Sequence, residues 1–133
     1  MALITRATTV SMDASTAMFA PQLTGLIAGE DLLAGAPVYI KSSDGLVYMS
    51  NGTAANEAAE IVGFTPRAVK SGQPLTVFGK GTRFNYATGL TPGDKYYIGA
   101  TAGRLDTATT TGDSVGVAQA ITSTDIRVIR DSF

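Results

Sequence analysis

The sequence contains neither cysteine nor histidine. Without cysteine there are no disulfides, thiolate nucleophiles or cysteine metal sites. Without histidine the chain lacks the commonest general base near neutral pH, the commonest metal ligand and every catalytic triad built on imidazole. Because only carboxylates and lysines remain for catalysis, we expect a protein that is not an enzyme and that holds neither a metal nor a cofactor.

Net charge is also small. The 10 lysines and arginines nearly balance the 11 acidic residues, which leaves a formal charge of -1. Such a chain has no overall field that would attract nucleic acid or an anionic membrane. Polar residues interrupt the apolar ones throughout residues 1–22, so this segment predicts neither a signal peptide nor a membrane span. We therefore expect no nucleic-acid partner and no membrane partner.

Short runs rich in valine, isoleucine, threonine, tyrosine and phenylalanine dominate the 133 residues, and glycine, proline, aspartate or asparagine separates them. This spacing is typical of an all-β sandwich or barrel of one domain. The predicted strands cover residues 24–27, 37–41, 46–50, 60–67, 75–78, 82–86, 95–99, 105–107, 114–120 and 125–129.

The chain contains the same strand–turn–strand pattern twice. Residues 34–47 (AGAPVYIKSSDGLV) align without a gap with residues 92–105 (PGDKYYIGATAGRL). Further along, EIVGFT from Glu60 matches SVGVAQ from Ser114, and LTVFGK from Leu75 takes the place of DIRVIR from Asp125. We expect a small β-barrel or sandwich of two similar halves, residues 25–79 and 83–130, that close on each other and so remove exposed sheet edges.

Three local features connect these strands. Alanine and glutamate in residues 52–61 favour a short helix with Thr53 as its cap. The sequence GKG at residues 79–81 predicts a tight hairpin that joins the two halves. Gly63 and Gly116 are expected inside strands, where glycine marks a bulge or a close approach of backbone.

Residues 1–22 lie outside the repeat, and we interpret them as an extended N-terminal arm that precedes a β domain at residues 23–133. The arm is apolar and poor in charge, so it gains most by pairing with another chain. The expected binding residues of the arm are Leu3, Ile4, Arg6, Val10, Met12, Met18 and Phe19. The alternative is that the arm folds back onto its own barrel as an extra strand.

Several residues could in principle form a chemical site. The aspartates of the predicted turns could flank a sugar as a catalytic pair, but bonding to their own backbone explains them better. Aromatic residues near lysine and arginine could stack bases, but packing in the core or between subunits is the better interpretation. We therefore expect a possible subunit interface at Tyr39, Phe84, Tyr86, Tyr96 and Tyr97.

One combination of motifs resembles a known family. Leu90, Gly93, Tyr96, Tyr97 and Ile98 form the pattern L-x-x-G-x-x-Y-Y-I, which G-x-L at residues 103–105, VGVA at 115–118 and IRV at 126–128 follow. This combination resembles the capsid cement, or head decoration, proteins of tailed bacteriophages. The resemblance implies a non-enzymatic virion protein, made in the host cytoplasm, that stabilises the outer capsid surface by bridging adjacent major capsid proteins. It also implies a homotrimer and a clamping N-terminal segment.

A second interpretation belongs to a different class. Similar β modules occur in phage fibres and baseplates, where an exposed loop recognises host glycan. Aromatic residues beside carboxylates on the SSDG turn (residues 42–45) or the TAGR turn (residues 101–104) would support that function.

Overall fold

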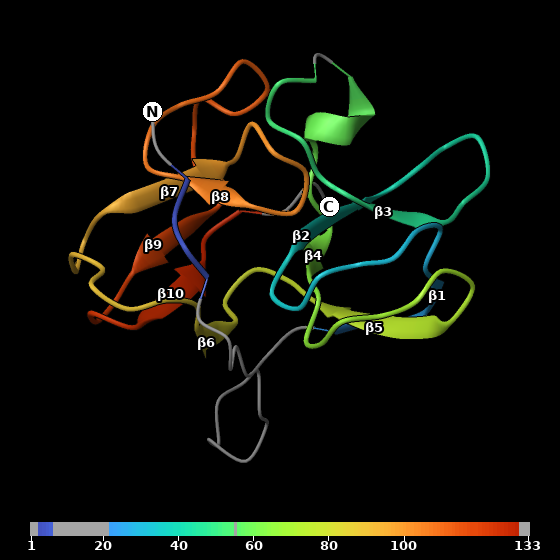
Figure 1. The fold of residues 1–133 in the computed structure, drawn as a ribbon, viewed down its shortest axis with the longest axis horizontal. Helices are drawn as coiled ribbons and strands as arrows, with labels where there is room; N and C mark the ends of the chain where they lie inside the picture. Colours follow the sequence, from blue (N-terminus) through green and yellow to red (C-terminus); the bar gives the residue numbers. More distant parts are fainter. Residues whose placement is uncertain (1–2, 7–21, 55, 131–133) are drawn as a thin grey trace.

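The computed structural model describes residues 3–6, 22–54 and 56–130. These residues form ten strands in two five-stranded antiparallel sheets, one from each half of the chain, which lie side by side (Figure 1). The strands are β1 (Gln22–Ile27), β2 (Pro37–Ile40), β3 (Val47–Met49), β4 (Gly63–Phe64), β5 (Pro74–Phe78), β6 (Arg83–Asn85), β7 (Lys95–Ile98), β8 (Leu105–Asp106), β9 (Ala118–Ala120) and β10 (Asp125–Val128). Each overlaps a predicted strand, which confirms the all-β fold class.

The two sheets have the same topology. The strand order is β1-β5-β4-β2-β3 in the first and β6-β10-β9-β7-β8 in the second, so every strand is replaced by the one five places later. The register agrees as well, because Tyr39 pairs with Tyr48 where Tyr97 pairs with Asp106. This confirms the prediction of two similar halves. The sheets are open, however, and do not close into the barrel that we considered.

The hydrogen bonds correct one part of the repeat alignment. Val62 donates its N–H to Val38, and Val117 donates its N–H to Tyr96, the counterpart of Val38. Val62 and Val117 are therefore equivalent, one position away from the match of sequence letters. Gly116 is also not inside a strand, since its φ of 98° bends the chain before β9 begins. Gly63 does lie in β4, as predicted.

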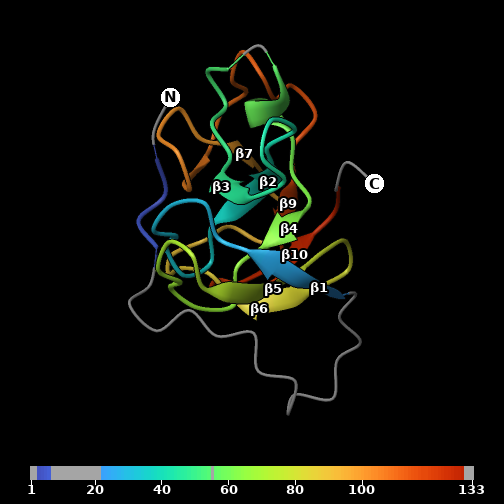
Figure 2. The same ribbon diagram turned by 90° about the vertical axis from the view of Figure 1, so that its right-hand side faces the viewer.

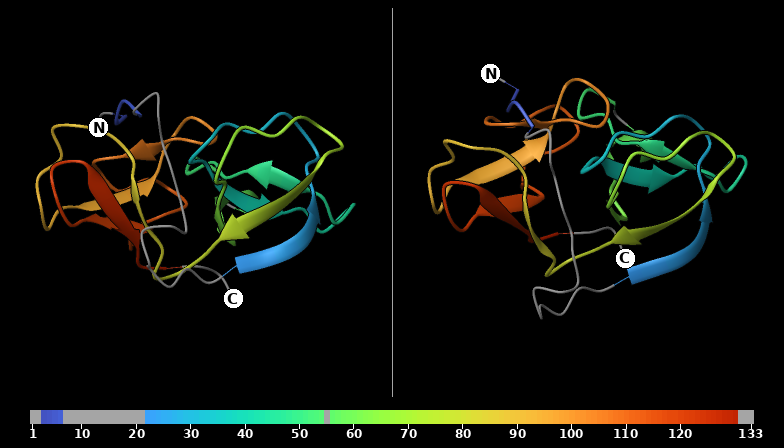
Figure 3. Two further views of the ribbon diagram at one scale, coloured as in Figure 1. Left: turned by 90° about the horizontal axis from the view of Figure 1, so that it is seen from below. Right: turned by 60° about the horizontal axis from the view of Figure 1, so that its bottom comes forward.

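The GKG segment is a turn between the sheets and not a hairpin. Thr82 donates its N–H to the carbonyl of Gly79, and Gly81 has a φ of 97°. The strands on either side cannot pair, because β5 already has β1 and β4 as neighbours and β6 pairs with β10. The chain therefore leaves the interior of one sheet and begins an edge of the other, as the crossing in Figure 3 shows.

The predicted helix at residues 52–61 shrinks to a single 3-10 turn, Glu57–Ala59. Its cap is Asn56, whose side chain accepts the N–H of Ala58, and not Thr53. The helix cannot begin earlier because the other half binds both backbone groups of Gly52. Gly52 donates its N–H to Gly99 and accepts the N–H of Gly112.

The second link between the halves is hydrophobic. Two buried clusters exist, and one of them lies entirely within the first half. The other contains most of the buried residues of the second half together with Ile61 and Phe64 from the first. Phe64 is completely buried and its ring lies 5.5 Å from that of Phe84. In the view of Figure 2 the two halves stand one behind the other across this contact.

Phe64 belongs to a row of residues that crosses the first sheet. Register pairs place Pro37, Phe64, Phe78 and Gln22 side by side on β2, β4, β5 and β1. The corresponding row of the second sheet, on β7, β9, β10 and β6, is Lys95, Gln119, Arg127 and Arg83. The middle of the first row is apolar, and its Phe64 contacts the other half. The second row is polar, and none of its members is buried.

The close packing of Gly52 against the second half predicts that one added methyl group destabilises the protein. A Cβ on Gly52 would overlap the carbonyl oxygen of Ile98 and the side chain of Thr110, so Gly52→Ala must separate the halves. We expect a loss of about 3 kcal/mol in the free energy of unfolding, measured by urea denaturation. Gly45→Ala is the control, since no atom lies within 4 Å of its added Cβ and only its φ of 72° is strained, at about 1 kcal/mol. Equal losses in the two variants would contradict a steric junction.

Candidate functional site

The duplication separates residues that the fold needs from residues that it does not. The turn at residues 41–46 and its copy at 99–104 are built alike. Lys41 donates its N–H to Leu46 as Gly99 does to Arg104, and both turns contain a glycine with positive φ, Gly45 or Gly103. Side chains that both copies share are explained by the fold. Side chains present in only one copy are the better candidates for function.

The first turn carries a set of side chains that its copy lacks. Tyr48 corresponds to Asp106 by strand register. By the gap-free alignment, Lys41 corresponds to Gly99 and Asp44 to Ala102. The second copy thus forms the same strands and backbone turn with other side chains at these three positions.

These residues come together at the β2–β3 end of the sheet, on the face opposite to Val38 and Val47. The rings of Tyr39 and Tyr48 have centroids 6.1 Å apart and planes inclined by 34°. The ammonium of Lys41 lies 5.0 Å from the centre of the Tyr48 ring, and the Tyr48 hydroxyl donates to Asp44 Oδ2 at 2.7 Å. We call these four residues, with Glu30 and Glu57, the tyrosine cluster. Its members come from β2, β3, the turn between them and two neighbouring loops.

Glu30 and Glu57 approach the cluster from opposite ends of the hairpin. Glu30, which follows β1, accepts the backbone N–H of Met49 at 2.9 Å. Glu57, in the 3-10 turn, accepts the N–H and the hydroxyl of Ser42 at 3.2 and 3.1 Å. Both carboxylates are thereby held in fixed positions. The cluster contains three carboxylates and one ammonium around two aromatic rings.

The electrostatics follow from these contacts. The N–H of Leu46 and then the hydroxyl of Tyr48 lower the pKa of Asp44 below its usual value. The same hydrogen bond to Asp44 raises the pKa of Tyr48. Partial burial, followed by the charges of Glu57, Glu30 and Asp44, raises the pKa of Tyr39. Both phenols therefore stay neutral at physiological pH and keep their hydroxyl protons as donors.

The second turn could not offer an equivalent site. A Cβ on Gly99 would meet the Leu3 side chain and the carbonyl of Arg104, and one on Gly103 would meet the Met49 side chain. Both glycines are buried, whereas Ser42, Ser43, Asp44 and Gly45 are all exposed. Only the first of the two turns is open to a ligand.

Other carboxylates of the β domain have structural partners. Asp106 and Asp113 each accept the backbone N–H two residues ahead, as Asp44 does, which confirms turn chemistry for these three aspartates. Asp113 also binds Arg130 at 3.0 Å, and Asp125 binds Arg83 at the same distance. Within the described ranges, no group of three acidic residues is arranged to hold a metal ion.

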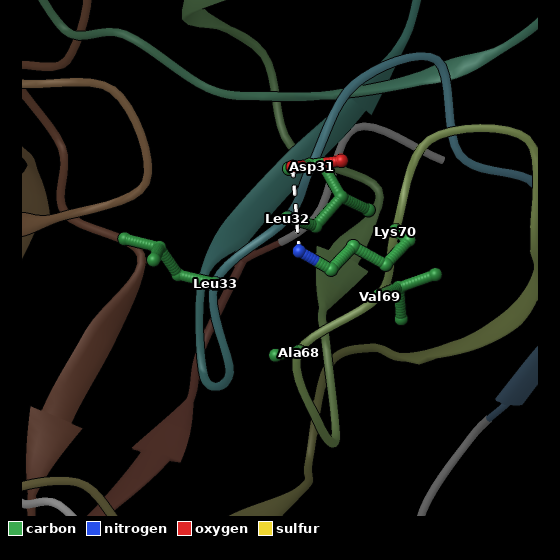
Figure 4. A pocket seen from close by; sticks show the side chains of 6 residues that line it. All are labelled: Asp31, Leu32, Leu33, Ala68, Val69 and Lys70. Carbon is green, nitrogen blue, oxygen red and sulfur yellow. Dashed lines mark ion pairs between the residues drawn. The ribbon is translucent and has the colours of Figure 1, made fainter.

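A surface hollow of about 240 Å³ lies elsewhere on the first half. Asp31, Leu32, Leu33, Ala68, Val69 and Lys70 line it. Figure 4 shows Lys70 reaching across to Asp31, 3.7 Å away, while Leu33 points away from the other side chains. The lining is mostly apolar, and the hollow is smaller than the roughly 300 Å³ at which ligand pockets begin. We do not assign a ligand to it.

The structure corrects the predicted subunit interface. Phe84, Tyr86 and Tyr96 are 3%, 0% and 4% exposed within the single chain, so they cannot contact another subunit. They belong to the core cluster of the second half. Tyr39 and Tyr97 remain half-buried on the surface. Sequence reasoning could not separate the two groups, because tyrosine suits both environments.

The predicted arm is held at its beginning by its own domain. Leu3 bridges to Asp106, and Ile4 donates its N–H to Leu105 at 3.1 Å (Figure 1). Ile4 is 9% exposed and belongs to the core of the second half, so it is not a free anchor. Leu3 stays 38% exposed and Arg6 is half-buried. Val10, Met12, Met18 and Phe19 lie outside the described residues. At Leu3 and Ile4 the chain follows the alternative that we considered.

The two halves acquire this edge contact differently. Gly29, just after β1, donates its N–H to Val47 on β3, the equivalent of Leu105. In the second half Ile4 makes that contact, because the chain after β6 runs toward Thr124 instead. The N-terminal residues thus cover a strand edge that the second half does not cover itself.

Sequence reasoning missed Lys41, Tyr48, Glu30 and Glu57 as site residues. For Tyr48 and Lys41 the signal was present in the repeat, since each faces a residue of different chemistry in the second copy. For Glu30 and Glu57 no signal was available, because they reach the hairpin from loops that are distant in the sequence. Among the described residues, no helix is long and apolar enough to cross a membrane.

The hydrogen bond between Tyr48 and Asp44 predicts a measurable shift. In Tyr48→Phe the Asp44 carboxylate loses one donor, so its pKa should rise toward the ordinary value. In the native protein a lowered pKa adds stability above the pKa of the unfolded chain, and this stability is lost as pH falls through the folded pKa. The variant should therefore lose less stability on acidification. NMR titration of the Asp44 carboxyl carbon measures the shift, with Tyr97→Phe as the matched control. An unchanged Asp44 pKa in Tyr48→Phe would refute the coupling.

Comparison with known proteins identifies no family for this chain. No family model matches the chain, and no curated protein matches it significantly. The resemblance to capsid decoration proteins therefore depends on the motifs quoted above, and the functional conclusion must be drawn from the two-half β domain, its edges and its surface.

Proposed function

We propose that the chain is a structural virion protein that binds the outer surface of a phage capsid and stabilises it by bridging adjacent major capsid proteins. It acts by binding and catalyses no reaction. The motif resemblance supports this function. The observation that carries it is the pair of attachment points of the N-terminal segment, which begins on β8 of the second half and ends at β1 of the first.

Residues 7–21 join these two attachment points, and their composition suits contact with another protein. They include Val10, Met12, Met18 and Phe19, and their only charged residue is Asp13. Burying such side chains against a neighbouring capsid subunit would contribute roughly 1.5–3 kcal/mol for each large one. The clamp that we propose is therefore a segment held at both ends by the β domain.

Strand β1 extends the same binding surface. It is the edge strand of its sheet and pairs with β5 alone among the described strands. No residue of β1 is buried, and Ile27 is 38% exposed. An edge strand of this kind has backbone donors and acceptors free for a strand of a partner. We propose that the major capsid protein pairs there, next to the apolar segment.

We propose a homotrimer as the assembled form, on the strength of the resemblance. Tyr39 and Tyr97 are the two residues of the predicted interface that stay available on the surface. Light scattering on the purified chain and mass analysis of decorated heads should both give three times the chain mass of 13.7 kDa. A monomer in both settings would remove this part of the proposal.

The clamp is tested by changing the segment without disturbing the fold. Deletion of the whole arm would also remove Ile4 from the core, so residues 7–20 are instead replaced by a glycine–serine linker of equal length. This variant should keep its melting temperature within a few degrees, because the described contacts of Leu3 and Ile4 remain. It should no longer add to heads assembled without the protein.

The matched control for this experiment is Val115→Ser, which removes an apolar side chain that is 60% exposed on the second half. It should decorate heads as the native chain does. If the linker variant binds heads as tightly as the native chain, the clamp is wrong. If the native chain itself does not bind undecorated heads in stoichiometric amounts, the proposed function is wrong.

The second candidate function is a fibre or baseplate module that recognises host glycan. The observation in its favour is specific: aromatic rings and carboxylates do lie together on the SSDG turn. The TAGR turn has no such group, and its Gly103 is packed against Met49.

A further inference from the structure

We propose that the tyrosine cluster is a binding site for a neutral sugar, formed by the stacking surface of Tyr39 and Tyr48 and the polar groups around it. The site does not depend on capsid decoration, because it lies on the β2–β3 hairpin and not on β1 or the N-terminal segment. It is consistent with either class of function, on a head or on a fibre.

The first argument is the stacking surface. A pyranose ring presents a face of C–H groups with partial positive charge, which the negative face of an aromatic ring attracts. Tyr39 and Tyr48 are direct cross-strand neighbours, and their ring planes are inclined by 34°, so the two rings form adjoining aromatic surfaces. Both side chains are only partly buried, whereas their neighbours Val38 and Val47, on the opposite face, are completely buried in the core.

The second argument is the set of polar groups at the rim. Sugar hydroxyls both donate and accept, so a site needs both kinds of partner. Lys41 supplies an ammonium donor 5.0 Å from the Tyr48 ring centre. Glu30 uses its Oε2 on the N–H of Met49, and the geometry leaves its other oxygen as an acceptor. The carboxylates of Asp44 and Glu57 are fixed by backbone donors before any ligand arrives, so little ordering entropy is lost on binding.

The third argument is that part of the cluster is specific to the first half. The copy keeps Tyr97, Ile98, Gly103 and Leu105 but has Gly99, Ala102 and Asp106 in place of the lysine, the aspartate and the second tyrosine. Its turn is also covered. The backbone of the turn therefore does not by itself account for Lys41 and Tyr48.

A neutral sugar fits the cluster better than a charged ligand. An anion would meet Glu30, Asp44 and Glu57 around a single lysine. A cation would be repelled by the Lys41 ammonium, which lies 5.0 Å from the centre of the Tyr48 ring. A neutral ligand with hydroxyl groups can form hydrogen bonds with Lys41 and with the carboxylates without repulsion from either.

The test uses the full-length chain and four defined probes: cellotetraose, maltotetraose, chitotetraose and choline chloride. Saturation-transfer NMR should show transfer to the ring protons of at least one tetrasaccharide, and titration should give its Kd. In Tyr48→Ala and in Tyr39→Ala that Kd should rise about tenfold or more, since each loses one aromatic surface. Tyr97→Ala, at the position equivalent to Tyr39, is the matched control and should leave the Kd unchanged.

Each other outcome overturns the proposal. Absence of transfer to all three sugars would do so, as would a sugar whose Kd changes equally in Tyr39→Ala and Tyr97→Ala. Transfer to choline in place of the sugars would identify a site for cations. Circular dichroism and melting curves confirm that each variant is folded, and Tyr48→Phe, which keeps the ring, should retain most of the affinity if an alanine variant is unstable. Head decoration by Tyr48→Phe should be unaffected, so failure here and failure of the proposed function are distinguishable.

Discussion

The structure depends most on the insertion of one side chain, Phe64, into the core of the opposite half. A 133-residue chain split into two separate units would leave each with a small core and marginal stability. The Phe64 side chain points to the face of its sheet that is opposite to the first cluster. There it packs against Phe84 in the core of the second half. Burial of a phenylalanine is worth roughly 1.5–3 kcal/mol, a large part of the net stability of a small domain. The backbone bonds of Gly52 then fix how the halves are turned toward each other.

Much of this fold could be predicted because it is local. Alternating apolar residues and turn-forming glycines located each strand, and the gap-free repeat located the two halves. The errors came from long-range contacts. The GKG turn has the sequence of a hairpin, but β5 has no free edge for β6. Residues 52–61 have helical propensity, but the second half occupies the backbone of Gly52. Such competition cannot be read from the segment itself.

At the candidate site, the sequence predicted the local hydrogen bonding of a residue but not its contact across the hairpin. Asp44 was expected to serve the turn, and it does so through the N–H of Leu46, yet its second oxygen holds Tyr48 in the cluster. One residue thus makes both a local contact of the turn and a contact across the hairpin. Three aromatic residues of the predicted interface, Phe84, Tyr86 and Tyr96, are instead core residues. In a duplicated chain the two halves can be compared with each other. Residues that both halves share indicate what the fold requires, and residues that differ on an exposed turn indicate candidates for surface chemistry.

The two rows across the sheets give the corresponding faces of the two halves different chemistry. The face through which the first half enters the second carries Phe64 and Phe78, and the same face of the second half carries Lys95, Gln119 and Arg127. A third copy of the unit, or the second half of another molecule, would have to desolvate those cations without a partner. The polar row therefore disfavours the stacking of a further sheet on this face. At high protein concentration this polar row would disfavour the growth of neighbouring molecules into fibres through this face.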